Sequence, residues 1–126
     1  MTALVVLDLS DNFLTGTITE NLGNDNTLKL FQFFVSDNLL TGTIPSSIGS
    51  FTNLELIKLS SNMLTGTLPT SLVLLTSCVA YIVNSNRLSG TLSEFFDAAS
   101  NESFPQLTGL DLSDNNFEGT VRIEIA

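Results

Sequence analysis

One asparagine-centred pattern recurs along the chain, and it constrains the fold more than any other feature of the sequence. Its anchors are spaced 26, 24, 24 and 29 residues apart. They are Asn12, Asn38, Asn62, Asn86 and Asn115. Apolar or nearly apolar side chains stand eight, five and three residues before each anchor and two and six residues after it, and a glycine stands four residues after it. Such self-similarity is typical of solenoids, in which each repeat packs only on its neighbours.

The residues before each anchor predict one short strand per repeat. Apolar residues five and three positions before the anchor, such as Ile57 and Leu59, give the alternation of a strand with one buried face. Strands of this kind stack in parallel at about 4.8 Å per step. The anchor follows where the chain must turn inward, and a buried amide there can accept from one backbone N–H and donate to nearby carbonyls. We therefore expect a parallel sheet and, beside it, a ladder of the five anchor asparagines.

The second half of each repeat predicts a return along the opposite side. The glycine after each anchor suits a backbone with positive φ, and threonine-rich segments such as LTGTI favour a second short strand. Pro45 and Pro69 suit the first turn of short α or 3₁₀ segments, predicted over 46–53 and 70–77. We place the extra residues behind the longer spacings in loops, at 23–27 and 98–105.

This pattern resembles the plant-type leucine-rich repeat, LxxLxLxxNxLxGxIPxxIGxLxxL. The segment SFTNLELIKLSSNMLTGTLP fits every defining position. Departures are Thr19, Ser93 and Arg122 at the proline position and Cys78 at the first leucine. The resemblance implies an α/β solenoid, a right-handed superhelix of about five repeats with a parallel concave sheet and short helical or 3₁₀ convex segments. We expect residues 1–126 to form one such domain.

The ends of the array carry no recognisable cap. Repeat arrays need terminal repeats with a polar outer face, and the paired-cysteine caps typical of the family are missing. We expect an uncapped part of a longer array whose ends can self-associate. The alternative is a short stand-alone solenoid whose end coils pair with something else.

Composition argues against several classes of partner and chemistry. A net charge of −9 with only four Lys and Arg residues disfavours nucleic acid and anionic membrane surfaces. With no His and one Cys, the chain has no histidine base, no Cys/His zinc site and no internal disulfide. No apolar run approaches the ~18–20 residues of a spanning helix, and no secretory signal is visible. We expect no enzyme, no metal, no cofactor and no direct membrane contact from this segment.

Two carboxylates directly precede anchors. Asp11 and Asp37 are expected on adjacent strands about 5 Å apart, a separation like that of retaining glycosidases. We interpret them as part of a solvated acidic row, with weak cation binding and catalysis as the alternatives.

Three other features outside the repeat pattern carry expectations. Cys78 replaces a core leucine and is expected to be a buried small apolar residue. Phe95 and Phe96 are expected to cover the core before the second insertion. Asn101 heads the N-x-[ST] triplet and is a possible N-glycosylation site.

Residues six and four positions before each anchor are predicted to point to the concave side. There Phe34, Leu56 and Ile82 would gather around Lys58, with Asp8 and Asp111 at the two ends of the array. We name the four central residues the concave patch. Apolar residues on adjacent strands resemble the anchors of interaction hot spots, although β-propensity alone also selects such residues.

The architecture favours binding over catalysis, because stacked strands give an extended face and no enclosed cavity. The resemblance implies an ectodomain of a receptor-like kinase or receptor-like protein, on the extracellular side of the plasma membrane or secreted. Our first hypothesis is a non-catalytic recognition module that binds a protein, peptide or glycan through the concave face. The alternative is a stand-alone inhibitor of cell-wall-degrading enzymes or a structural extracellular protein.

Overall fold

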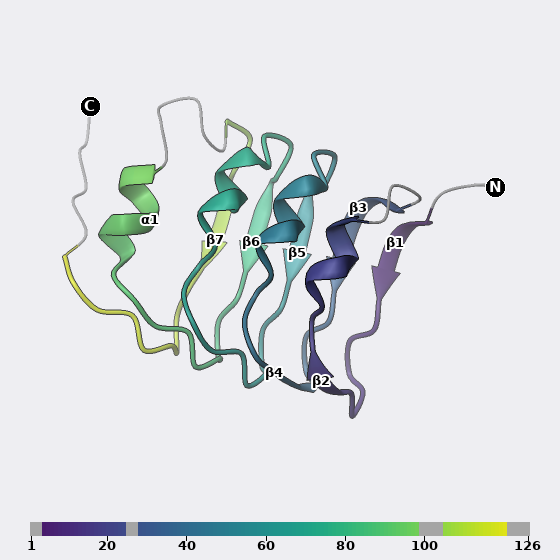
Figure 1. The fold of residues 1–126 in the computed structure, drawn as a ribbon, viewed down its shortest axis with the longest axis horizontal. Coiled ribbons are helices and arrows are strands. Elements are labelled where there is room, and N and C mark those ends of the chain that lie inside the picture. Colours follow the sequence, from purple (N-terminus) through teal and green to yellow (C-terminus); the bar gives the residue numbers. More distant parts are fainter. Residues whose placement is uncertain (1–3, 25–27, 99–104, 121–126) are drawn as a thin grey trace.

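The structure, a computed structural model, describes residues 4–24, 28–98 and 105–120 of the chain. Within them, five parallel strands form one sheet in the order β1-β3-β5-β6-β7 (Figure 1). The strands are β1 (Leu4–Asp8), β3 (Leu28–Phe34), β5 (Leu56–Lys58), β6 (Ala80–Ile82) and β7 (Gly109–Asp111). One parallel strand per repeat, each paired with the strand of the next repeat, confirms the predicted solenoid.

Short helical segments run back on the side opposite the sheet (Figure 1). They are the 3₁₀ helices η1 (Glu20–Asn24), η2 (Ser46–Ser50) and η3 (Thr70–Leu74) and the α-helix α1 (Leu92–Ala98). Pro45 and Pro69 stand directly before η2 and η3 with extended backbones, φ −70° and −67°, so they precede the first turn instead of occupying it. Because proline has no N–H, neither residue can continue the backbone hydrogen bonding of a strand.

A second, smaller sheet forms where the threonine-rich segments stack. β2 (Thr15–Thr17) and β4 (Leu39–Thr41) pair in parallel. In later repeats the described residues form only isolated bridges there, Thr43 with Thr65 and Thr91 with Glu118. The predicted second strand is therefore regular only between the first two repeats of the described chain.

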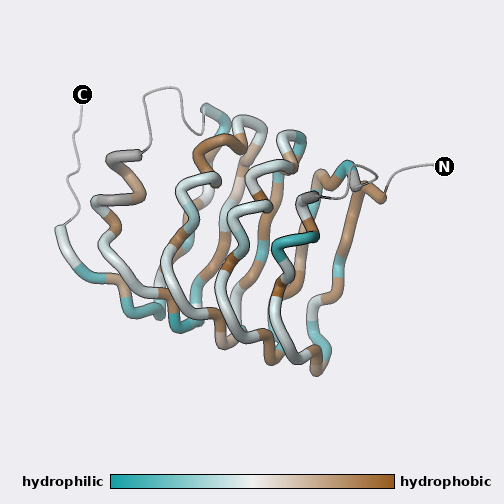
Figure 2. Tube along the Cα trace, viewed as in Figure 1, coloured by the Kyte–Doolittle hydropathy of each residue, from teal (hydrophilic) through white to brown (hydrophobic). Residues whose placement is uncertain are grey.

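The core lies between the large sheet and the convex segments. In the three central repeats the positions eight, five and three residues before the anchor are at most 3% exposed. They are Leu30, Phe33, Val35, Leu54, Ile57, Leu59, Cys78, Tyr81 and Val83. Apolar residues recur at matching places in successive coils (Figure 2). A stack of such coils buries a continuous core that no single coil could bury alone.

The register between β1 and β3 shifts within the pair. Leu4 pairs with Leu28, but Val6 pairs with Gln32, so the offset between β1 and β3 grows from 24 to 26 residues inside the strand. Residues 25–27 of the loop predicted at 23–27 lie outside the described residues. In the described part, β3 accommodates two extra residues as a bulge, and because the side chains of a strand alternate with a period of two, the buried face stays in phase. Most of the second predicted loop, 98–105, lies outside the described residues.

Two glycines on the convex side are fixed by close packing between coils. Gly23 lies in η1 and Gly49 at the matching place in η2. A Cβ on Gly49 would lie 2.6 Å from the carbonyl oxygen of Ser71, and one on Gly23 would clash with the carbonyl of Ser47. Only glycine allows the convex segments to approach so closely.

Candidate functional site

The anchor asparagines tie each coil to the one before it. Asn62 Oδ1 accepts from the N–H of Leu40 at 3.0 Å, and its Nδ2 donates to the carbonyl of Val35 at 2.9 Å and to that of Leu59 at 3.2 Å. Asn38, Asn86 and Asn115 repeat this arrangement. Each amide satisfies backbone groups that the turn leaves without partners, at the place where the concave face ends.

The residue before each anchor adopts a left-handed backbone. The φ angles of Asp11, Asp37, Ser61, Ser85 and Asp114 lie between 52° and 57°. Asp11 and Asp37 therefore stand in the turns and not on strands, since β1 ends at Asp8 and β3 at Phe34. The sequence-based placement on strands was wrong, because the chain already leaves the sheet two residues before these positions. Both side chains are exposed.

The strand register aligns the residues of the concave face in two columns. Gln32, Leu56 and Ala80 pair in one column, and Phe34, Lys58 and Ile82 pair in the other. Phe34, Leu56 and Ile82 are half-buried and Lys58 is exposed. The Nζ of Lys58 lies 5.0 Å from the ring centroid of Phe34, within the range of a cation–π contact. All four residues of the concave patch thus lie on three adjacent strands.

The concave patch forms the floor of an open hollow of about 750 Å³. Ala80 completes the apolar part, and hydroxyls and carboxylates of the first three repeats line the rest: Asp8, Ser10, Asp11, Ser36, Asp37 and Ser60. Ser36 Oγ and Ser60 Oγ lie 3.3 Å apart. Sequence reasoning missed this row of hydroxyls, although serine recurs two residues before the anchors. Ligand sites in proteins measure about 300–1,000 Å³, and the hollow falls in that range.

Acidic residues stand at both ends of the Phe34 column. The backbone N–H of Ser10, 3.0 Å from Asp8 Oδ1, holds the pKa of Asp8 below its usual value. The hydroxyl of Ser113, 2.6 Å from Asp111 Oδ1, does the same for the pKa of Asp111, with help from the Ser113 N–H. Both carboxylates are therefore charged at neutral pH and flank the apolar centre with negative charge.

A family model for the leucine rich repeat matches four segments of the sequence, residues 3–24, 29–51, 53–75 and 106–126. The chain belongs to the leucine-rich repeat family. The unmatched stretch holds the repeat with Cys78 and Ser93, whose strand β6 nevertheless pairs in register with both neighbours. No curated protein sequence matches the chain significantly.

Solved leucine-rich repeat structures resemble the chain over most of its length. The crystal structure of PEPR1 with AtPEP1 superposes with a TM-score of 0.80 and 34% identity, covering 94% of this chain and 16% of that one. The plant peptide hormone receptor RGFR1 in complex with RGF2 has a TM-score of 0.78 and 30% identity, covering 90% of this chain and 17% of that one. The leucine-rich repeat ectodomain of the Arabidopsis receptor kinase HAESA, with an N-terminally extended IDA peptide hormone ligand, has a TM-score of 0.77 and 33% identity, covering 90% of this chain and 18% of that one. The chain spans less than one fifth of each.

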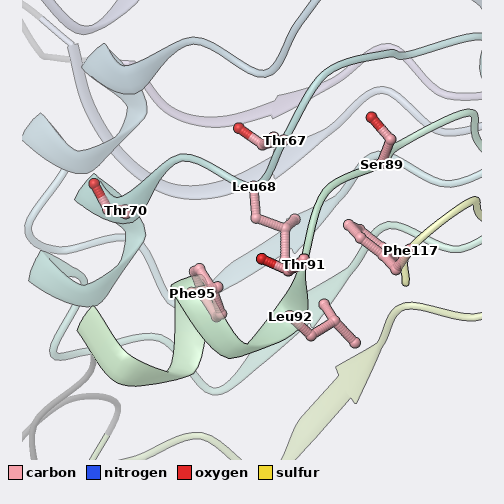
Figure 3. A pocket seen from close by; sticks show the side chains of 8 residues that line it. All are labelled: Thr67, Leu68, Thr70, Ser89, Thr91, Leu92, Phe95 and Phe117. Carbon is pink, nitrogen blue, oxygen red and sulfur yellow. The ribbon is translucent and has the colours of Figure 1, made fainter. Parts of the chain in front are cut away.

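A small pocket lies beside α1, between the segments that follow the anchors Asn62, Asn86 and Asn115 (Figure 3). Its volume is about 70 Å³, far below the size of ligand sites in proteins. Leu68, Leu92, Phe95 and Phe117 supply its apolar wall. Phe95 is 4% exposed and Phe96 is 39% exposed, so only the first of the two phenylalanines covers the core as predicted. Phe96 packs edge-on against Phe95, with ring centroids 5.5 Å apart.

The remaining candidate residues from the sequence are Cys78 and Asn101. Cys78 is buried as predicted, and burial raises the pKa of its thiol to about 11. Among the described residues no group of three or more His, Cys, Asp or Glu could hold a metal ion. Asn101 lies outside the described residues. None of the described helices is long and apolar enough to cross a membrane.

Proposed function

We propose that this chain is a non-catalytic recognition module, part of a receptor-like or secreted protein, that binds an extracellular protein or peptide on its concave face. The observation that carries the proposal is the hollow of about 750 Å³ whose floor is the concave patch. A shallow face of apolar side chains with a polar border is the anatomy of a protein-binding surface, not of an enclosed substrate pocket.

The contacts of Phe34 favour a peptide or protein over a glycan. A sugar ring packs against an open aromatic face, whereas Lys58 Nζ stands over the Phe34 ring at 5.0 Å. Leu56, Ala80 and Ile82 instead give an apolar surface beside Lys58 on which an apolar side chain of a peptide can pack. Two of the similar structures support this choice: RGFR1 is a plant peptide hormone receptor, and HAESA was solved with a peptide hormone ligand.

A peptide-display experiment tests the proposal. A random peptide library is selected against the full chain, and the recovered peptides are synthesised and titrated by fluorescence polarisation. We expect the double variant Phe34→Ala with Ile82→Ser to weaken binding by at least about 2 kcal/mol, roughly 30-fold in Kd, because hot-spot side chains carry most of the binding energy.

The matched control is Leu74→Ser on the convex side. Leu74 is 59% exposed in η3, so it is an accessible apolar residue outside the concave patch. Its variant should bind the selected peptides as tightly as the unaltered chain. Two results would refute the assignment of the concave patch as the binding surface. One is an equal loss of peptide affinity in both variants, and the other is that the selected peptides bind the double variant as tightly as the unaltered chain.

A further inference from the structure

The hollow over the concave patch has two chemically different halves. The carboxylates that line it come from the first two coils and form its acidic half: Asp8, Asp11 and Asp37. The apolar half comes from the third and fourth coils: Leu56, Ala80 and Ile82. Among the described lining residues, the only ammonium group is that of Lys58. A ligand in this hollow therefore meets negative charge at one end and an apolar surface at the other.

The carboxylates of the acidic half are open to a ligand. Within the described chain none of them forms an ion pair with a lysine or arginine, and Lys58 Nζ lies over the Phe34 ring instead. Asp8 Oδ1 accepts only from the N–H of Ser10. Asp37 is exposed although a coil stacks on each side of its own. Uncompensated negative charge in a hollow attracts cationic groups, so the acidic half favours a positively charged side chain of the ligand.

The strand register sets the distance between the two halves. Four neighbouring strands contribute one residue each to a single column: Asp8, Phe34, Lys58 and Ile82. Three steps of about 4.8 Å place Asp8 and Ile82 about 14 Å apart along this column. An extended peptide that crosses the strands covers about 3.3 Å per residue, so about four residues span that distance. Side chains four positions apart lie on the same side of an extended chain, so both can face the hollow.

We propose that the peptide bound on the concave face carries a cationic side chain four positions away from a large apolar one. This inference rests on the proposed function and adds the chemistry of the ligand. The arginine or lysine of the peptide contacts Asp8 and Asp37, and the apolar side chain packs on Leu56, Ala80 and Ile82. An arginine suits the acidic half well, because its guanidinium group has five N–H donors and can reach more than one carboxylate.

The peptides selected on the unaltered chain give the first test. We expect Arg or Lys four positions from Leu, Ile, Val or Phe, in either chain direction, more often than in the unselected library. Replacing that cationic residue by Gln in a synthetic peptide should weaken binding about tenfold, the scale of one or two exposed charge pairs. Fluorescence polarisation measures the loss, which should shrink at high salt because ions screen exposed charges.

The double variant Asp8→Asn with Asp37→Asn tests the acidic half from the side of the protein. Asparagine keeps an acceptor for the N–H of Ser10 and tolerates the left-handed backbone of Asp37, φ 56°. This variant should bind the selected peptides about tenfold more weakly than the unaltered chain, mainly through slower association. It should also bind the peptides with Arg or Lys no more tightly than those with Gln.

The matched control is Asp111→Asn with Asp114→Asn in the last coil. It removes the same amount of charge from the same two positions of the repeat. Asp111 Oδ1 accepts from the N–H of Ser113, and Asp114 has a φ of 52°, but neither residue lines the hollow. The control variant should bind the selected peptides as tightly as the unaltered chain. An equal loss in the control would show a dependence on net charge alone and would overturn the inference.

The remaining outcomes separate this inference from the proposed function. Peptides that depend on Phe34 and Ile82 but show no enrichment of Arg or Lys, or that bind the Asp8→Asn, Asp37→Asn variant without loss, would overturn the inference and leave peptide recognition standing. Failure to select any peptide would overturn both. Circular dichroism checks that the variants are folded. If a variant is unstable, the Gln-substituted peptides decide the question, because they need only the unaltered chain.

Discussion

The third coil and the first coil carry the same sequence pattern but differ in what surrounds them. Asn62 bonds to Leu40 and Val35 of the preceding coil, whereas among the described residues Asn12 donates only within its own turn. The residues three positions before these anchors, Leu59 and Leu9, are 0% and 39% exposed. The pattern thus sets the path of each coil, and the neighbouring coils supply the burial and the hydrogen bonds that stabilise it.

The largest difference is expected from removing an anchor amide. Asn62→Ala leaves the N–H of Leu40 buried without an acceptor and removes one amide donor from each of the carbonyls of Val35 and Leu59, which should lower the free energy of unfolding by about 3–5 kcal/mol. Asn12→Ala removes only contacts in an exposed turn and should cost about 1 kcal/mol or less. Urea titrations followed by circular dichroism measure both. Similar losses of unfolding free energy in the two variants would mean that the ladder hydrogen bonds between coils contribute little to stability.

Truncating a core side chain should give a smaller difference in the free energy of unfolding between the third and the first coil. Leu59→Ala opens a cavity at a fully buried position, with an expected loss of about 3 kcal/mol, whereas Leu9→Ala should cost about 1 kcal/mol because the site is already open to water. The same titrations apply, with Leu74→Ser as a control for exposed apolar side chains. The comparison fails if the Leu9 variant is the less stable of the two.

Thiol reactivity gives another test of the difference in burial between the central coils and the first coil. Burial raises the pKa of Cys78 from 9.0 to about 11, so at pH 8 its thiolate is about 100-fold rarer than that of an ordinary cysteine. Iodoacetamide should modify Cys78 only on unfolding, and a cysteine introduced by Leu9→Cys in the first coil should react readily. Because the unfolded chain loses this proton at lower pH, the stability contributed by the protonated thiol should be lost as pH rises from 9 to 11.

The smallest effect is expected at a buried hydroxyl. Tyr81 is 2% exposed, and its hydroxyl has no hydrogen-bond partner among the described residues. Tyr81→Phe should raise the free energy of unfolding by about 1 kcal/mol, since it removes an unsatisfied buried polar group. At the matching position of the last coil Leu110 is 38% exposed, so Leu110→Tyr should be nearly neutral. A loss of stability in Tyr81→Phe would reveal a partner for the hydroxyl.

The sequence was sufficient to predict the strands of the large sheet, the turn positions and the convex 3₁₀ segments after Pro45 and Pro69, because each depends on residues that recur at fixed offsets. The positive φ predicted for the glycines after the anchors is present at all five, from 76° at Gly42 to 98° at Gly90. The burial of Cys78 followed from its place in the pattern. Periodicity reports the contacts between neighbouring coils, since these contacts repeat with the sequence.

What the sequence did not predict depends on single junctions. The bulge in β3 reflects how one pair of strands absorbs two extra residues, and the pattern cannot distinguish a loop from a bulge at that place. The left-handed turn at Asp11 and Asp37 was also missed, although Asp tolerates that conformation better than most residues. The packing of Gly49 on Ser71 depends on the distance between convex segments, which no spacing reports.

The candidate site was partly predictable. Which residues share a column on the concave face follows from the spacing to the anchors, and the strand register has the same columns. The position of Lys58 over Phe34 and the hydroxyl pair of Ser36 and Ser60 depend on side-chain rotamers, which the sequence pattern does not specify.

The ladder bonds that join two coils all link residues 22 to 32 positions apart, so each reaches only the adjacent coil. Opening one coil therefore breaks contacts with its immediate neighbours and leaves more distant coils intact. Such an array frays inward from its ends, and amide hydrogen exchange should be slowest in β5 and faster in β1 and β7. In this respect the chain behaves as a row of coupled units, in which the central coils open last on heating.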